Sequence, residues 1–192
     1  MVDKYSLPIS VTIDGEEIRI RNECDYRICL DCIKISKDES LSDQDKSFIS
    51  LNVFYEDFYK IKNYEEAIAI MVEIINGEET PKVSELNQEI SDKKMPIADF
   101  NIDFPLYVAP LNAKLGYDCR RKEFTHWWTF LSAYKEIGDC YFAQVVNIRK
   151  KRYLDHRPLD KQEQRFYLEN QKDVNALYKM SAEDEAFLND EF

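Results

Sequence analysis

Residues 63–77, NYEEAIAIMVEIING, predict a helix whose two ends are both marked in the sequence. Asn63 is a favoured N-cap residue, Glu66 stands in the capping-box position three residues later, and Gly77 is a favoured helix terminator. Between these ends, apolar residues occupy nearly every side of the helix. A helix that is apolar all round is normally enclosed by other elements, so we expect it at the centre of the fold.

A β-hairpin is predicted before this helix. Ile9–Ile13 and Glu17–Ile20 alternate apolar and polar residues, and Asp14-Gly15 lies between the two runs. Asp-Gly is typical of a type I′ turn, because both central residues of that turn need a positive φ. We therefore expect a hairpin over roughly residues 8–21. A hairpin alone is marginally stable, so its apolar face must pack on helices. That face consists of Val11, Ile13, Ile18 and Ile20.

Hydrophobic periodicity predicts further helices around this pair of elements. Their expected ranges are about 25–35, a helix that Ser42 begins, one from Asp103 that Pro110 kinks or ends, 123–137, 141–149, and a long helix from Pro158 to about Tyr178. The helix that Ser42 begins carries Phe48, Leu51, Phe54, Tyr55 and Phe58. Only 4 Gly and 6 Pro are present, which argues against a turn-dense all-β fold. The predicted fold class is mainly α (α+β), with an N-terminal β-hairpin packed on a bundle of about six to seven helices.

The expected domain organisation is a single domain over residues 1–180. Residues 78–98 are highly charged and contain few large apolar residues, so they are interpreted as a mobile linker within that domain. Residues 181–192 hold five acidic residues and are interpreted as a disordered tail.

The net charge of −11 disfavours a nucleic-acid-coating role, because binding to phosphates needs a cationic surface. No stretch approaches the roughly 20 apolar residues that would span a bilayer, and residues 1–4 do not resemble a signal peptide. Five cysteines form a poor disulfide framework, so free thiols in a soluble cytoplasmic protein are expected. No nucleic acid or membrane is expected as a partner.

Catalytic alternatives are weak in this sequence. Cys29-x-x-Cys32 would need two further ligands to hold zinc, and no second close pair of cysteines or histidines accompanies it. A thiol enzyme would pair His126 with Cys119 or Cys140, but no glycine-rich oxyanion turn follows. We expect His126 instead to satisfy a buried backbone carbonyl with a ring nitrogen. The sequence therefore predicts a non-enzymatic protein without a cofactor, with a small metal-dependent nuclease or thiol enzyme as the weaker alternative.

A partner-binding surface is predicted beside the helix at 123–137, whose aromatic residues extend over more than one face. Two adjacent tryptophans cannot face the same way, so one of them is expected near the surface, where Trp often anchors a partner. The basic run that follows is interpreted as a rim steering an acidic partner, or as a helix C-terminus that complements the macrodipole. The candidate residues are Trp127, Trp128, Phe130, Tyr134, Arg149, Lys150, Lys151 and Arg152.

Six short motifs occur in an order that resembles a known family. They are Leu7-Pro8, Asp25-Tyr26-Arg27, Leu51-Asn52-Val53-Phe54-Tyr55, Glu65-Glu66-Ala67-Ile68, His126-Trp127-Trp128-x-Phe130 and Phe142-x-x-Val145-Val146-x-Ile148-Arg149. The chain resembles the bacteriophage "gene product fifteen" family of long-tailed phages and prophages of Gram-positive bacteria. The resemblance covers most of residues 7–152 and brings no catalytic residues with it.

The resemblance implies a tail-assembly chaperone in the cytoplasm of the bacterial host, because family members typically lie just upstream of the tape-measure gene. Such a protein holds the long tape-measure protein and helps to recruit tail-tube subunits, so these two are the expected partners. The alternative function is a structural virion component, such as a head–tail connector or a tail-terminator subunit. A homo-oligomer is compatible with both interpretations.

Overall fold

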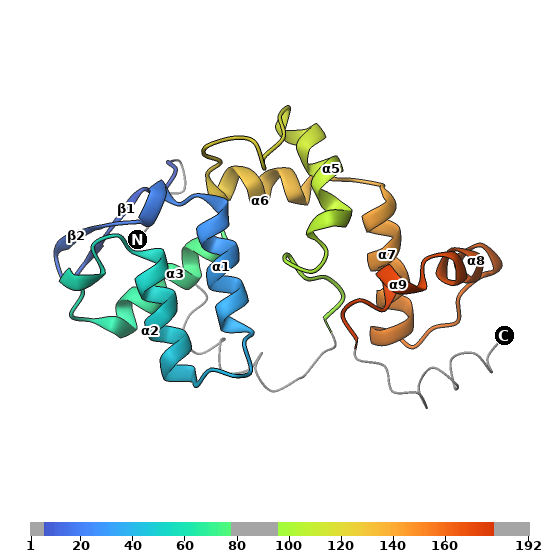
Figure 1. Ribbon diagram of the computed structural model, residues 1–192, viewed down its shortest axis with the longest axis horizontal. Coiled ribbons are helices and arrows are strands. Elements are labelled where there is room, and N and C mark those ends of the chain that lie inside the picture. The colour runs from blue at the N-terminus through green and yellow to red at the C-terminus, as the bar shows by residue number, and fades with distance from the viewer. Residues whose placement is uncertain (1–5, 78–95, 179–192) are drawn as a thin grey trace. The chain divides into compact units, whose positions relative to one another are not determined.

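The computed structural model describes residues 6–77 and 96–178 (Figure 1). The chain divides into two compact units. The first holds the residues up to Asp92 together with Leu111–Glu136, and the second holds Lys93–Pro110 and the residues from Ile137 onward. Nearly all of the expected linker at 78–98 and the whole acidic tail at 181–192 lie outside the described residues. One domain over residues 1–180 therefore stays a prediction.

The hairpin of the first unit is confirmed. Strands β1 (Ser10–Ile13) and β2 (Glu16–Arg19) pair antiparallel, with Val11 opposite Ile18. Asp14 and Gly15 both have positive φ, as the type I′ turn requires. The expected apolar face is buried, and the hairpin continues into the helices through a bridge between Ile20 and Tyr55. The hairpin therefore packs on the helical part of the unit, as an isolated two-stranded sheet must.

Helices make up the rest of the first unit. They are η1 (Arg21–Glu23), α1 (Tyr26–Ser36), α2 (Asp43–Phe54), η2 (Phe58–Lys60), α3 (Tyr64–Asn76) and α6 (Trp127–Lys135), together with the end of α5 (Phe104–Leu115). Side-chain caps fix the starts of three of these helices. In each cap, a side chain accepts a hydrogen bond from the second or third N–H of the helix. Asp25 caps α1, Ser42 caps α2 and Asn63 caps α3. Gly77 ends α3 in the left-handed conformation, so both predicted ends of that helix are confirmed.

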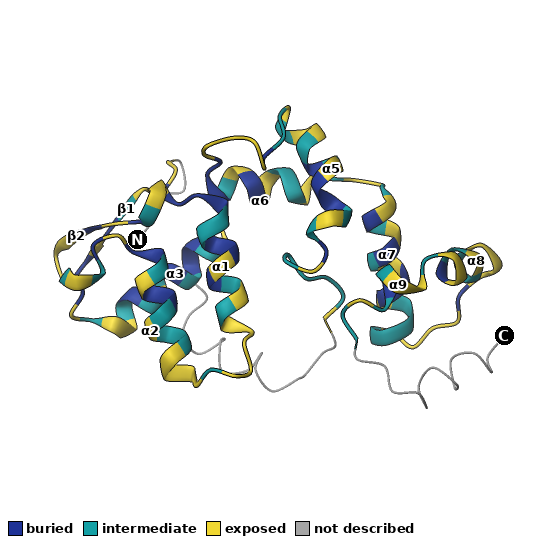
Figure 2. Ribbon diagram, viewed as in Figure 1, coloured by how far each residue is buried: buried dark blue, intermediate teal, exposed yellow. Residues whose placement is uncertain are grey.

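Helix α3 is enclosed on one side. Ala67, Met71 and Ile74 are buried, and the Tyr55 hydroxyl donates a hydrogen bond to the Ala67 carbonyl at 2.9 Å. Ile68 and other apolar residues of α3 are only half-buried (Figure 2). The helix is therefore less enclosed than its composition predicted.

The second unit contains α7 (Tyr141–Arg149), the π-helical turn η3 (Lys150–Leu154), α8 (Lys161–Glu169) and α9 (Gln171–Val174), with the first part of α5. Its core is formed by Val145, Ile148, Leu159, Tyr167 and Val174. Together with α1, α2, α3 and α6 of the first unit, these helices bring the described residues to eight α-helices, beside one two-stranded sheet. This confirms the predicted fold class.

Two helix boundaries of this region differ from those predicted. The single helix from Pro158 to Tyr178 is wrong, because α8 begins only after Asp160, whose capping box with Glu163 fixes the start. Asn170 then ends α8 by donating its side-chain amide to the Phe166 carbonyl at 2.8 Å. The preceding α5 continues through Pro110 to Leu115, although a proline there removes a backbone hydrogen bond. The buried side chains of α5 on both sides of Pro110 offset that loss; they are Tyr107, Val108 and Leu111.

No helix within residues 6–77 and 96–178 has the length and apolar character needed to cross a membrane.

The hairpin turn gives the first testable prediction. Gly15 has a φ of +80°, and a Cβ at that position would have no heavy atom within 4 Å. Replacing Gly15 with Val therefore adds backbone strain without a steric clash, and we expect a loss of about 1–2 kcal/mol in stability. Gly15→Asn, a residue that tolerates positive φ, is the control and should lose less. Thermal unfolding measures both, and an unchanged melting temperature for Gly15→Val contradicts the turn assignment.

Candidate functional site

Helix α6 begins at Trp127 rather than at Glu123, because His126 is its N-cap. His126 Nδ1 accepts a hydrogen bond from the Trp128 backbone N–H at 3.1 Å. Since Nδ1 is an acceptor, the ring proton lies on Nε2, which donates to the Pro8 carbonyl at 3.2 Å. His126 is 3% exposed. Its predicted role of satisfying a buried backbone carbonyl is confirmed.

The residues just before α6 cannot be helical, because their backbone groups pair with another segment. The Tyr26 N–H donates to the Thr125 carbonyl and the Trp127 N–H donates to the Cys24 carbonyl, both at 2.9 Å. The Thr125 N–H donates to the buried Asp25 carboxylate at 3.0 Å. Residues 24–26 and 125–127 thus form a short antiparallel pairing that fixes where α6 starts.

The two tryptophans of α6 bind the C-terminal end of α3. Trp127 Nε1 donates to the Ile75 carbonyl at 2.8 Å, and Trp128 Nε1 donates to the Ile74 carbonyl at 2.9 Å. Carbonyls in the last turn of a helix lack a full set of partners within the helix, so the indoles act as caps. Trp127 is fully buried and Trp128 is half-buried. Trp128 is therefore the more exposed tryptophan, yet its polar atom already has a partner inside the unit.

The aromatic ring of Phe130 completes this packing. It stacks on Tyr26 with the ring centroids 4.6 Å apart and on Trp127 at 5.5 Å. Phe130 and Trp127 are both fully buried, so they lie in the core and not on the expected docking surface. Tyr134 is half-buried and, with Trp128, remains accessible.

The residues of the expected basic rim belong to the second unit. The first of them, Arg149, is not on the surface, contrary to expectation. Arg149 is fully buried and forms an ion pair with Asp103, with N–O distances of 2.7 and 2.8 Å. The same guanidinium donates to the carbonyls of Val174, Ile97 and Asp173. A guanidinium has five N–H donors in a fixed plane, and these contacts use them to join distant parts of the unit. Arg149 is a core residue.

The other three basic residues keep some exposure. Lys150 is exposed, and the Lys151 ammonium forms an ion pair with Glu163. The Arg152 guanidinium lies 4.0 Å from the centroid of the Tyr167 ring, within the range of a cation–π contact. These residues belong to the second unit, whereas the tryptophans belong to the first.

Three buried thiols, Cys24, Cys29 and Cys32, lie close together in the first unit. All five cysteines are free, and Cys24 Sγ lies 3.8 Å from Cys29 Sγ. A hydrogen bond from Cys29 is the main cause that lowers the pKa of Cys24 to about 6, with a smaller effect of His126, against the opposing effect of burial. Burial raises the pKa of Cys29 well above its usual range. Both thiols are fully buried among the core side chains of the first unit.

The cysteine pairs considered in the sequence are not the ones in contact. The close pair is Cys24 with Cys29, not Cys29 with Cys32, and His126 neighbours Cys24 rather than Cys119 or Cys140. Across the part of the chain that the structure describes, no group of three or more His, Cys, Asp or Glu side chains is arranged to hold a metal ion.

An exposed aromatic surface lies where the sequence did not predict one. We give the name aromatic row to Phe48 of α2, Phe58 of η2 and Tyr64 of α3, together with Tyr59, which follows Phe58 in the chain. Phe48 is 54% exposed, Tyr59 80% and Tyr64 47%, while Phe58 is half-buried. The ring of Phe58 contacts Phe48 edge-on at 5.2 Å and stacks with Tyr64 at 5.8 Å. The dense run of aromatic residues between 48 and 64 was the available signal, since two short helices cannot bury so many rings.

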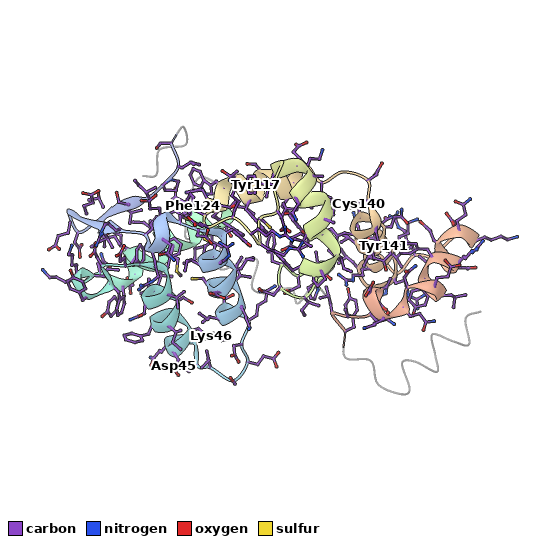
Figure 3. All side chains as sticks on the ribbon, turned by 45° about the horizontal axis from the view of Figure 1, so that its top comes forward. Asp45, Lys46, Tyr117, Phe124, Cys140 and Tyr141 are labelled. Atoms are coloured by element: carbon purple, nitrogen blue, oxygen red, sulfur yellow. The ribbon has the colours of Figure 1, made fainter. Side chains whose placement is uncertain are left out.

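Charged side chains accompany the row. Asp45 and Lys46, labelled in Figure 3, lie on α2 about one turn before Phe48. Asp57, beside Phe58, is buried and forms ion pairs with Arg19 and Lys60. Its hydrogen bond with the Arg19 side chain is the main cause that lowers the pKa of Asp57 to about 2. The carboxylate thus stays ionised and anchors η2 at neutral pH.

The family model described as "Bacteriophage Gp15 protein" matches residues 3–178, and the chain therefore belongs to this family. Its members are phage structural or assembly proteins that are generally non-enzymatic. No curated protein and no solved structure gives a significant match.

The cap of α6 gives the second prediction. His126→Ala removes both the N-cap and the partner of the Pro8 carbonyl, so we expect the first unit to lose about 2 kcal/mol. His126→Asn keeps an acceptor for the Trp128 N–H and should lose less. The only two tryptophans of the chain lie in this segment, so their fluorescence during urea unfolding reports on this unit. Equal losses for the two variants contradict the capping role.

The buried ion pair gives the third prediction. Asp103→Ala leaves the Arg149 charge buried without its carboxylate, and we expect the second unit to lose about 3–5 kcal/mol. Glu169→Ala breaks the ion pair with Arg165, in which the Glu169 side chain is 60% exposed and the Arg165 side chain 82%. Because the pair is exposed, its loss should change stability by at most about 0.5 kcal/mol. Amide hydrogen exchange of α7 measures both effects. Unchanged protection of α7 in Asp103→Ala shows that the pair does not organise the unit.

Proposed function

We propose that this chain is a non-enzymatic tail-assembly chaperone that binds the phage tape-measure protein and helps to recruit tail-tube subunits. Family membership supports a phage assembly or structural role, and the resemblance to proteins encoded next to the tape-measure gene supports this particular role. The observation that carries the proposal is the aromatic row, an exposed apolar surface on a folded unit.

The physical argument rests on what such a surface does. Neighbouring exposed aromatic side chains mark an interaction site more often than scattered ones, because their burial by a partner removes apolar area from water. A tape-measure protein is long and helix-rich, with an apolar face that must stay covered before the tail is built. Helix-in-groove recognition uses this kind of surface, since one apolar helix face covers a set of aromatic anchors.

The residues expected from the sequence have a smaller part in this proposal. Trp128 and Tyr134 are half-buried, and Trp128 is already engaged with the end of α3. Lys150 is exposed and available to an acidic segment of a partner, while Lys151 is shared with Glu163. The aromatic row therefore has more free apolar surface than the candidates around α6.

The proposal is tested by titrating the purified protein with fragments of its tape-measure protein and by mass spectrometry of mature particles. A chaperone binds at least one helical fragment and is absent from the finished virion. A failure of every tape-measure fragment to bind contradicts the proposal. Stoichiometric presence in particles favours the alternative, a head–tail connector or tail-terminator subunit that stays in the virion.

A further inference from the structure

We infer that the aromatic row is the docking site of the first unit and that its occupant is a basic amphipathic helix of the partner. The inference deepens the proposed function and rests on it only for the identity of the partner. Three features of the row favour this inference: the spacing of the rings, the contacts that hold them in place and the charge of the surrounding side chains.

The spacing of the rings fits a helix. The centroid of Phe58 lies 5.2 Å from that of Phe48 and 5.8 Å from that of Tyr64. Both distances are close to the ~5.4 Å pitch of an α-helix. The three contacting rings thus extend over at most about two turns of a partner helix.

The row is preformed. Phe58 is held between its two neighbours, and its short helix η2 is fixed by the Lys60 N–H donating to the Asp57 carbonyl at 2.9 Å. The Asp57 side chain receives two further bonds from the Arg19 guanidinium at 3.0 and 3.3 Å. A surface whose rings are already ordered loses little conformational entropy when a partner binds.

The charge of the side chains around the row favours a positively charged partner. Residues 42–66 contain three lysines and six carboxylates, a net charge of −3, and Arg19 and Arg21, whose guanidinium groups bond to this segment, bring the local charge to −1. Each lysine is paired with a carboxylate of the first unit: Lys46 with Asp43, Lys60 with Asp57, and Lys62 with Glu16. The cations are thus neutralised, while the carboxylates outnumber them.

Two exposed carboxylates stand next to the ends of the row. Asp45 precedes Phe48 by about one helical turn, and Glu65 directly follows Tyr64. The Asp45 carboxylate accepts from the Ser42 hydroxyl at 2.6 Å and is still exposed. A helix with Lys or Arg beside its apolar stripe places a cation near each of the two carboxylates while it covers the rings. A second copy of this chain is the poorer occupant, because two chains of net charge −11 repel each other.

The test uses the full-length protein and two designed helical peptides of about five turns. One peptide carries a leucine stripe flanked by lysines, and the other carries the same stripe flanked by glutamates. We expect the lysine peptide to bind at least about tenfold more tightly than the glutamate peptide, with an affinity that falls as salt rises. Equal binding of the two peptides overturns the assignment of a basic occupant.

Variants locate the binding surface. Tyr59→Ser and Phe48→Ser each replace an exposed ring and are expected to weaken lysine-peptide binding about tenfold, with circular dichroism as the folding control. Leu168→Ser, at a 51% exposed apolar residue of the second unit, is the matched control and should bind as the wild type does. Asp45→Lys with Glu65→Lys should slow association. Wild-type affinity in both ring variants overturns the inference.

The failures of the two proposals are distinguishable. If the lysine peptide binds through the row but no tape-measure fragment binds, the docking site stands and the partner is wrong. If a tape-measure fragment binds equally to wild type and to Tyr59→Ser and Phe48→Ser, the function stands and the site is wrong. Sedimentation that shows a dimer dissociating in Tyr59→Ser identifies the row as a self-association surface and overturns the inference.

Discussion

The antiparallel pairing of residues 24–26 with residues 125–127 joins two parts of the first unit that are 100 residues apart in the chain. The pairing uses backbone groups that would otherwise be buried without partners, so it must form for α1 and α6 to pack. Asp25 caps α1 and also receives the Thr125 N–H, and His126 caps α6 from within the pairing. One short contact thus fixes the starts of two helices.

This pairing explains why the sequence His-Trp-Trp-x-Phe occurs where it does. All four of its named side chains have structural roles, because His126 holds the Pro8 carbonyl, the tryptophans hold the end of α3, and Phe130 stacks on Tyr26. The second unit depends in the same way on the ion pair of Arg149 with Asp103. These two of the six motifs of the resemblance therefore serve packing.

The parts of the fold that depend on local chemistry could be predicted from the sequence. The Asp14-Gly15 turn and the caps Asn63 and Ser42 act through neighbouring residues, so their signals lie within a few positions of each other. The start of α6 could not be predicted, because hydrophobic periodicity continues to Phe124, whereas the backbone just before α6 is hydrogen-bonded to a distant segment. The split of α8 from α9 depends on a single side chain, Asn170.

The candidate site was harder to predict than the fold. A run of four basic residues resembles a solvated face, and nothing local shows that Arg149 meets a carboxylate 46 positions away. Phe48 has the spacing of a core residue, yet it is 54% exposed. Periodicity identifies the faces of a helix, but only the packed neighbours decide which face is open.

The central claim is that the His-Trp-Trp segment holds the first unit together and does not itself bind the partner. Nuclear magnetic resonance of the two indole N–H groups tests it most directly, because Trp127 and Trp128 are the only tryptophans in the chain. Both indole protons should exchange slowly with solvent, and both signals should stay in place when a helical partner is added. Rapid exchange of either indole, or a large shift of the Trp128 signal on binding, would contradict the account.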